Sequence, residues 1–305
     1  MRFVLRVVAL AAVLFVFLGV TAAVTGVAEP PPAPGAAPGA PAAPSGGMQI
    51  LAPVLFCVLV SALLSWLIVR SALFGVRLLA AVFLAQFGLG TFMPQIESVV
   101  FLPRQLPPGF VNRLFAMGAL MALFAGPAAV WIHGRFRRSP LPGPPPSGVP
   151  STAGGWAGRL AALAAAYVAL YFLAGYFIAY RNPDVVAYYG DTDAGSFLAA
   201  LHRIWTERPW LFGLQAVRGV LWVACVLPFI VSFRGRPGEL PLLVGSAFAV
   251  WLVMLLAPNP YMPESVRMSH LVETVSSNFV FGCIVGAAFA RPRARRSLAT
   301  APTGA

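Results

Sequence analysis

The sequence predicts an all-α, polytopic membrane protein: a transmembrane helix bundle of about eight spans with N and C termini cytoplasmic. The 305 residues are 59% hydrophobic and only 10% charged. Eight apolar stretches of roughly twenty residues recur along the chain, each long enough to cross a ~30 Å hydrocarbon core as a helix. Loops rich in arginine alternate with loops that carry most of the acids, as expected where a chain crosses a membrane repeatedly.

The N-terminal stretch predicts a membrane anchor followed by a linker. Residues 7–28 are apolar and follow Arg2 and Arg6, so residues 1–28 are interpreted as a transmembrane signal-anchor. A cleaved signal peptide is the alternative, although this apolar run is longer than the core of most signal peptides. Residues 29–48 are rich in Pro, Ala and Gly with a single charge. We expect them to form a flexible external linker.

The rest of the chain predicts one bundle of seven helices over residues 49–290. The spans are expected at 49–69, 78–92, 111–132, 156–180, 209–233, 240–257 and 270–290. The loop 181–208 is the longest polar connection, and within it Phe197, Leu201 and Ile204 recur at helical spacing. This spacing predicts a short amphipathic helix on the external surface. Residues 291–305 form a basic tail, expected to be cytoplasmic.

The distribution of charge predicts orientation rather than a nucleic-acid partner. All 21 basic residues are arginine, which gives a net charge of +12. Fourteen of them lie on one side of the predicted spans, where Glu239 is the only acid, so that side is expected to be cytoplasmic. No basic patch alternates with base-stacking aromatic residues, which argues against nucleic acid. Arginine in place of lysine is typical of a GC-rich bacterial genome, and we expect a bacterial cytoplasmic (inner) membrane location.

Known catalytic and cofactor motifs do not occur in the chain. It contains no H-E-x-x-H, P-loop or G-x-S-x-G pattern. Cys57, Cys225 and Cys283 fall within predicted spans and form no C-x-x-C. The sequence therefore predicts no cofactor, no metal site and no identifiable catalytic residue.

Arg218 is the most informative single residue, because it lies deep inside the predicted span 209–233. A charge at the centre of a membrane helix costs about 2.5–3.5 kcal/mol, so such residues face the bundle interior and find partners. Gln215 lies on the same helix face, one turn away. Glu97 and Glu273 are the natural carboxylate partners, and of the two we expect Glu273 to pair with Arg218.

Other polar residues are expected to join Arg218 in an outward-facing polar site. His270, Glu273 and Ser277 are spaced i, i+3 and i+7 at the start of the last span, which places them on one helix face. The predicted ligand-binding residues are Arg218, Glu273, His270, Glu97, Gln215, Ser277, Asn278 and Arg113. The alternative is that Arg218 fastens two helices together and that the others are ordinary residues of the membrane interface.

The leading functional hypothesis is a non-enzymatic membrane protein that binds or translocates a small anionic or lipidic ligand through this site. One alternative is an intramembrane enzyme acting on a lipid-linked substrate at the outer leaflet, with Glu273 or His270 as general base. Another is a membrane scaffold or assembly subunit. Gly282 and Gly286 form a G-x-x-x-G pattern that suits close contact with a helix of this chain or of a partner. The lipid bilayer is an expected partner in every case.

Overall fold

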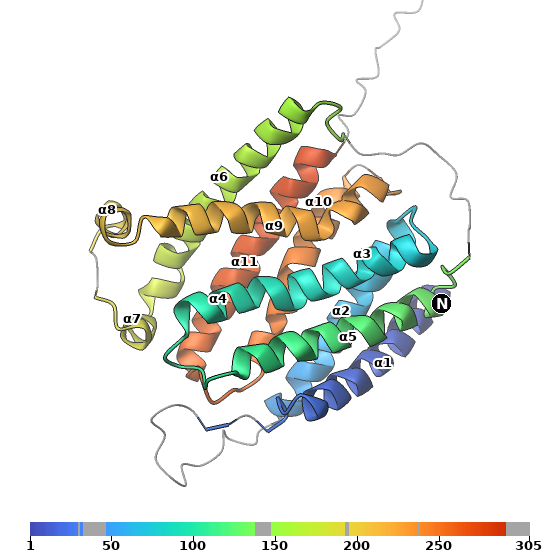
Figure 1. Ribbon diagram of the computed structural model, residues 1–305, viewed down its shortest axis with the longest axis horizontal. Helices are drawn as coiled ribbons and strands as arrows, with labels where there is room; N and C mark the ends of the chain where they lie inside the picture. The colour runs from blue at the N-terminus through green and yellow to red at the C-terminus, as the bar shows by residue number, and fades with distance from the viewer. Residues whose placement is uncertain (30, 33–46, 138–147, 193–194, 237, 291–305) are drawn as a thin grey trace, which may run out of the picture.

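The computed structural model confirms the all-helical fold class (Figure 1). It describes the chain except residues 30, 33–46, 138–147, 193–194, 237 and 291–305. Within the described residues, the only β-type pairing is one isolated bridge between Ser71 and Phe233. Eight helical segments are long and apolar enough to cross a membrane: Arg2–Val24, Met48–Arg70, Gly75–Phe101, Phe110–Ile132, Ala153–Arg181, Trp210–Ser232, Glu239–Leu256 and Glu264–Phe289.

Several of these spans are built from more than one helical element. The elements in chain order are α1 (Arg2–Val24), α2 (Met48–Arg70), α3 (Gly75–Phe87), η1 (Gly88–Phe92), α4 (Met93–Phe101), α5 (Phe110–Ile132), α6 (Ala153–Phe177), η2 (Ala179–Arg181), α7 (Pro183–Tyr189), α8 (Phe197–Glu207), α9 (Trp210–Ser232), α10 (Glu239–Ala249), η3 (Val250–Leu256) and α11 (Glu264–Phe289). Of these, η1 is a π-helix, whereas η2 and η3 are 3₁₀-helices.

The spans pack into one bundle in which α1, α2 and α5 lie side by side, while α6 packs on both α9 and α11 (Figure 1). Aromatic side chains fill the centre: Trp222, Phe248 and Phe281 are almost completely buried. The Phe248 ring centroid is 4.9 Å from that of Trp222 and 5.6 Å from that of Phe281, so α9, α10 and α11 share one core.

Helices α10 and α11 make the closest backbone approach of the bundle's core. A Cβ atom placed on Gly282 would lie 2.5 Å from the carbonyl oxygen of Val244, and one on Gly286 would lie 2.5 Å from the Cα of Pro241. Only glycine permits this spacing. The G-x-x-x-G face of α11 is therefore covered by α10 of the same chain.

Two predicted span boundaries were wrong, and both errors affect the site. The third span was expected to end at residue 92, but its helix continues to Phe101. The π-helix η1 precedes Pro94, which lies at the first turn of α4 where its missing N–H costs little. The last span was expected from residue 270 but begins at Glu264, directly after Pro263. Glu97, His270 and Glu273 therefore all lie on membrane-length helices.

The connection between α6 and α9 contains two short helices. As predicted, α8 is amphipathic. Two of its large apolar side chains, Leu198 and Trp205, are 74% and 61% exposed. Helices α7 and α8 lie at the left of Figure 1, far from the N-terminus. We call this the cavity end of the bundle, and the end where α1 begins and α11 finishes the terminal end. The linker predicted at 29–48 lies mostly outside the described residues, and the tail at 291–305 lies entirely outside them.

Candidate functional site

A cavity of about 990 Å³ occupies the cavity end of the bundle. Its wall is formed by α4, α6, α9, η3 and α11, with α7 and α8 covering part of it. A cavity of this volume is at the upper end of the range that accommodates a small organic ligand. The polar residues that line the cavity include Gln95, Glu97, Gln105, Tyr171, Tyr189, Asn259, His270, Glu273, Ser277 and Asn278.

Two irregular helical segments meet at this cavity. Gly90 of the π-helix η1 and Trp251 of the 3₁₀-helix η3 both line it. A Cβ atom on Gly90 would lie 2.7 Å from Cε3 of Trp251, so the indole ring packs directly on the glycine backbone. Departures from α-helical geometry are frequent at functional sites of membrane proteins, where broken helices border a polar binding site.

The buried Arg218 forms an ion pair with Glu97, which is partly exposed. Its Nη2 atom donates a hydrogen bond to Oε1 of Glu97 at 2.5 Å, and its Nη1 atom donates to Oε1 of Gln215 at 2.8 Å. The guanidinium also lies 5.7 Å from the centroid of the Tyr167 ring. The Arg218 side chain is 3% exposed, whereas that of Glu97 is 38% exposed and lines the cavity. Glu97 therefore presents its carboxylate to the cavity, and Arg218 holds it from behind.

The expected pairing of Arg218 with Glu273 was wrong. Because the helix that carries Glu97 extends through α4 to Phe101, this carboxylate lies on a membrane-length helix within reach of α9. Glu273 instead accepts a hydrogen bond within its own helix, from His270 one turn earlier.

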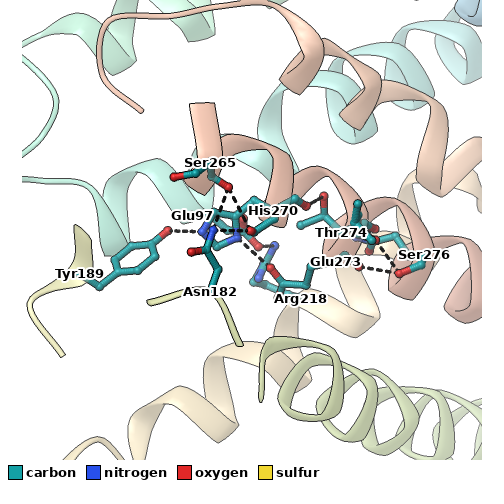
Figure 2. Close-up of polar contacts among 12 residues, drawn as sticks. Glu97, Asn182, Tyr189, Arg218, Ser265, His270, Glu273, Thr274 and Ser276 are labelled. Carbon is teal, nitrogen blue, oxygen red and sulfur yellow. Dashed lines mark hydrogen bonds and ion pairs between the residues drawn. The ribbon is translucent and has the colours of Figure 1, made fainter. Parts of the chain in front are cut away.

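Tyr189, His270 and Glu273 form a chain of hydrogen bonds in the cavity wall (Figure 2). Nδ1 of His270 lies 2.8 Å from Oε2 of Glu273, and Nε2 lies 3.0 Å from the Tyr189 hydroxyl. An ionised carboxylate only accepts hydrogen bonds, so Nδ1 carries the proton and Nε2 of a neutral ring accepts from the tyrosine. Burial, with a smaller contribution from Glu97, raises the pKa of Tyr189 and keeps its hydroxyl protonated as this donor.

The wall also contains polar groups with unused hydrogen-bonding capacity. Among the described residues, the hydroxyls of Tyr171 and Ser277 have no hydrogen-bond partner. The Asn259 side chain uses its oxygen to accept from two backbone N–H groups and leaves its NH₂ group free. Nδ2 of Asn278 donates to the carbonyl of Thr274, while Oδ1 is buried without a partner. Polar groups in a cavity wall that keep free hydrogen-bonding capacity can bind an external ligand.

The structure brings together most of the predicted site residues. Glu97, His270, Glu273, Ser277 and Asn278 line one cavity, while Arg218 and Gln215 lie behind its wall. Arg113 is not part of the site: it lies on α5 beside the turn after α1, where its Nη1 is 3.2 Å from the position of a Cβ on Gly26.

Sequence reasoning missed the aromatic part of the wall. Tyr171, Tyr180, Tyr188, Tyr189 and Trp251 all line the cavity. Five tyrosines occur between residues 171 and 189 of the printed sequence, not counting Tyr167 just before them. This density at the end of a predicted span was an available signal, but it also fits an ordinary aromatic belt at the membrane interface.

No family model, curated protein or solved structure matches this chain. Eight apolar helices of membrane-spanning length define a multi-pass membrane protein. Among the described residues, no three His, Cys, Asp or Glu side chains group together as metal ligands.

Proposed function

We propose that this protein binds a small ligand, as a lipid headgroup or a free molecule, in the cavity between α4, α6, α9 and α11. The observation that carries this proposal is a cavity of about 990 Å³ that is bordered by membrane-length helices and has carboxylate, imidazole and hydroxyl groups in its wall. Polar and ionisable groups inside a membrane bundle are costly, and bundles retain them chiefly where they serve a pathway or a ligand. A cavity that opens among membrane spans is accessible to an amphiphile as well as to a water-soluble molecule.

The distribution of charge around the cavity favours a lipidic ligand over a small anionic one. Arg218 was expected to supply positive charge, but both of its terminal nitrogens are occupied and its guanidinium lies behind Glu97. The arginines that do line the cavity, Arg104, Arg203 and Arg208, come from the connecting segments rather than from the spans. An uncharged polar group within the cavity would suit this arrangement.

We also propose that the cavity end faces away from the cytoplasm of a bacterial inner membrane. The support is the arginine bias of the terminal end, where Arg70, Arg135 and Arg236 all lie in connections or at helix ends. The cavity would then receive its ligand from the outer leaflet or from the external solution.

The proposal is tested by filling the cavity. Gly175 of α6 lines it, and a Cβ atom there would lie 3.7 Å from Oε1 of Glu273, an ordinary contact. Gly175→Leu therefore adds bulk to the cavity without a backbone clash. The full chain, extracted in the polyoxyethylene detergent C12E8 and incubated with a bacterial total lipid extract, is examined by native mass spectrometry. We expect the wild-type chain to retain a bound molecule and Gly175→Leu to retain at least tenfold less.

Gly158→Leu is the matched control. Gly158 lies on the same helix, is exposed, and has no atom within 4 Å of a Cβ placed on it. This variant should retain the molecule as the wild type does. Equal retention by all three proteins would show that bound molecules lie outside the cavity and would contradict the proposal.

An intramembrane enzyme is a second candidate, favoured by one observation. The hydroxyl–imidazole–carboxylate chain of Tyr189, His270 and Glu273 has the connectivity of a general-base relay and borders the cavity. His270 would accept a proton from a substrate hydroxyl that displaces Tyr189, and Glu273 would orient the ring.

A further inference from the structure

We propose that the cavity recognises a hydroxyl-rich ring, the glycosyl group of a sugar or of a glycolipid. This inference rests on the proposed binding function and names its ligand class. The hydrogen-bonding groups and charges of the wall match an anion, a cation and a polyol to different degrees.

An anion is poorly matched to the inner wall. Among the cavity-lining residues on the membrane-length helices, none is an arginine. The wall instead presents the carboxylates of Glu97 and Glu273. The guanidinium nearest to them belongs to Arg218, which is engaged by Glu97 and Gln215. A buried anion would face two carboxylates with no free cation to compensate them.

A cation is also poorly matched, for a different reason. Each carboxylate already has a basic partner, since Glu97 is 2.5 Å from Nη2 of Arg218 and Glu273 is 2.8 Å from Nδ1 of His270. The wall also contains a donor that an ammonium group cannot satisfy, the free NH₂ of Asn259. A cation has no acceptor to offer it.

A hydroxyl group can both donate and accept, and the wall requires both. On the donor side is the free NH₂ group of Asn259, whose oxygen already accepts from two backbone N–H groups. The hydroxyls of Tyr171 and Ser277 are themselves donors and acceptors. These groups come from several separate elements, so a ligand with several hydroxyls around a ring can meet them together.

Aromatic side chains complete the match to a sugar ring. Tyr180 and Tyr189 lie with their ring centroids 6.3 Å apart and their planes 13° from parallel, and both line the cavity with Trp251. A pyranose ring has apolar C–H faces and a polar edge of hydroxyl groups. A ligand pocket with aromatic walls and a few placed polar groups is complementary to both. Hydroxyls at the ring edge would form hydrogen bonds with Tyr171 and Ser277.

The test uses probes that share a dodecyl chain and differ in headgroup. The full chain is held in C12E8 and titrated with dodecyl maltoside, dodecyl phosphate or dodecyltrimethylammonium, with tryptophan fluorescence as the signal because Trp251 and Trp210 line the cavity. We expect saturable binding of dodecyl maltoside, at least tenfold tighter than that of either charged probe. Competition by free maltose would identify a soluble sugar as the ligand source, and absence of competition a glycolipid.

Tyr171→Phe is the decisive variant, because it removes one hydroxyl and keeps the ring. It should weaken dodecyl maltoside binding about tenfold, which corresponds to 1.4 kcal/mol. Tyr261→Phe is the control: its hydroxyl donates to the carbonyl of Pro31, away from the cavity lining, and its loss should leave binding unchanged.

Two results would overturn the inference. If dodecyl phosphate or dodecyltrimethylammonium binds as tightly as the maltoside and Gly175→Leu abolishes that binding, the cavity is a ligand site but not one for sugars. If no probe binds saturably, the glycosyl assignment fails, and the retention experiment with Gly175→Leu decides separately whether the binding function fails with it.

Discussion

The two halves of α11 have opposite surroundings although they belong to one continuous helix. Its C-terminal half packs on α10 through Gly282 and Gly286, where Cβ atoms would meet backbone atoms at 2.5 Å. Its N-terminal half, with Ser277 directly after it, carries His270 and Glu273 along the wall of a cavity, and we call this part the cavity half. The difference shows that one continuous helix can pack closely against its neighbour in one part and border a cavity in the other.

The largest expected effect on folding comes from a substitution in the packed half of α11. Gly286→Leu would place a branched side chain where even a Cβ lies 2.5 Å from the Cα of Pro241, so α10 and α11 must separate. We expect little or no folded protein by size-exclusion chromatography in C12E8. Gly213→Leu on α9, where no atom lies within 4 Å of an added Cβ, should elute as the wild type does. A normally folded Gly286→Leu protein would refute the packing difference between the two halves.

The next largest effect concerns the ion pair behind the cavity wall. Glu97→Leu leaves Arg218 as a buried charge without a carboxylate partner. Breaking a fully buried pair costs about 3–5 kcal/mol, and because Glu97 is 38% exposed we expect a cost below that range. We expect a clear decrease of the melting temperature. The double variant with Glu97→Leu and Arg218→Leu should recover at least half of that decrease, because it removes both charges together. A double variant less stable than the single one would show that the two side chains do not act as a pair.

The smallest expected effect on stability comes from the cavity half of α11. In Glu273→Gln the amide oxygen can still accept the hydrogen bond from His270, so the cost should be about 1 kcal/mol. We therefore expect Glu273→Gln to change ligand binding or turnover more than it changes the free energy of unfolding. Retained glycoside binding together with loss of turnover of a glycoside substrate would favour the enzyme alternative. If binding and folding are both unchanged and no turnover is found in the wild type, the binding function alone remains.

Much of the fold could be predicted from the sequence because membrane spans have a strong local signal. Length and apolarity located all eight spans, and the spacing of Phe197, Leu201 and Ile204 located α8. The boundaries that failed depend on non-local packing. The continuation of the third span past Pro94 requires the π-helix η1, whose Gly90 packs against Trp251 on a distant span.

The candidate site was predictable in composition but not in pairing. A buried arginine requires a carboxylate, so Arg218 together with Glu97 and Glu273 could be selected from the chain alone. Which carboxylate pairs with it depends on the relative placement of α4, α9 and α11, which periodicity along one helix does not specify. Arg113 was assigned to the site because it lies near the start of its span, whereas it lies beside Gly26.

The most direct test of the central claim is the accessibility of the cavity half of α11. Ser277→Cys places a thiol in the cavity wall, and Cys283 of the parent protein provides a comparison in the packed half of the same helix. In C12E8, a water-soluble cationic methanethiosulfonate reagent should modify Ser277→Cys at least tenfold faster than any thiol of the parent, and dodecyl maltoside should slow that modification. Modification of Ser277→Cys no faster than in the parent would contradict the account of an accessible ligand cavity.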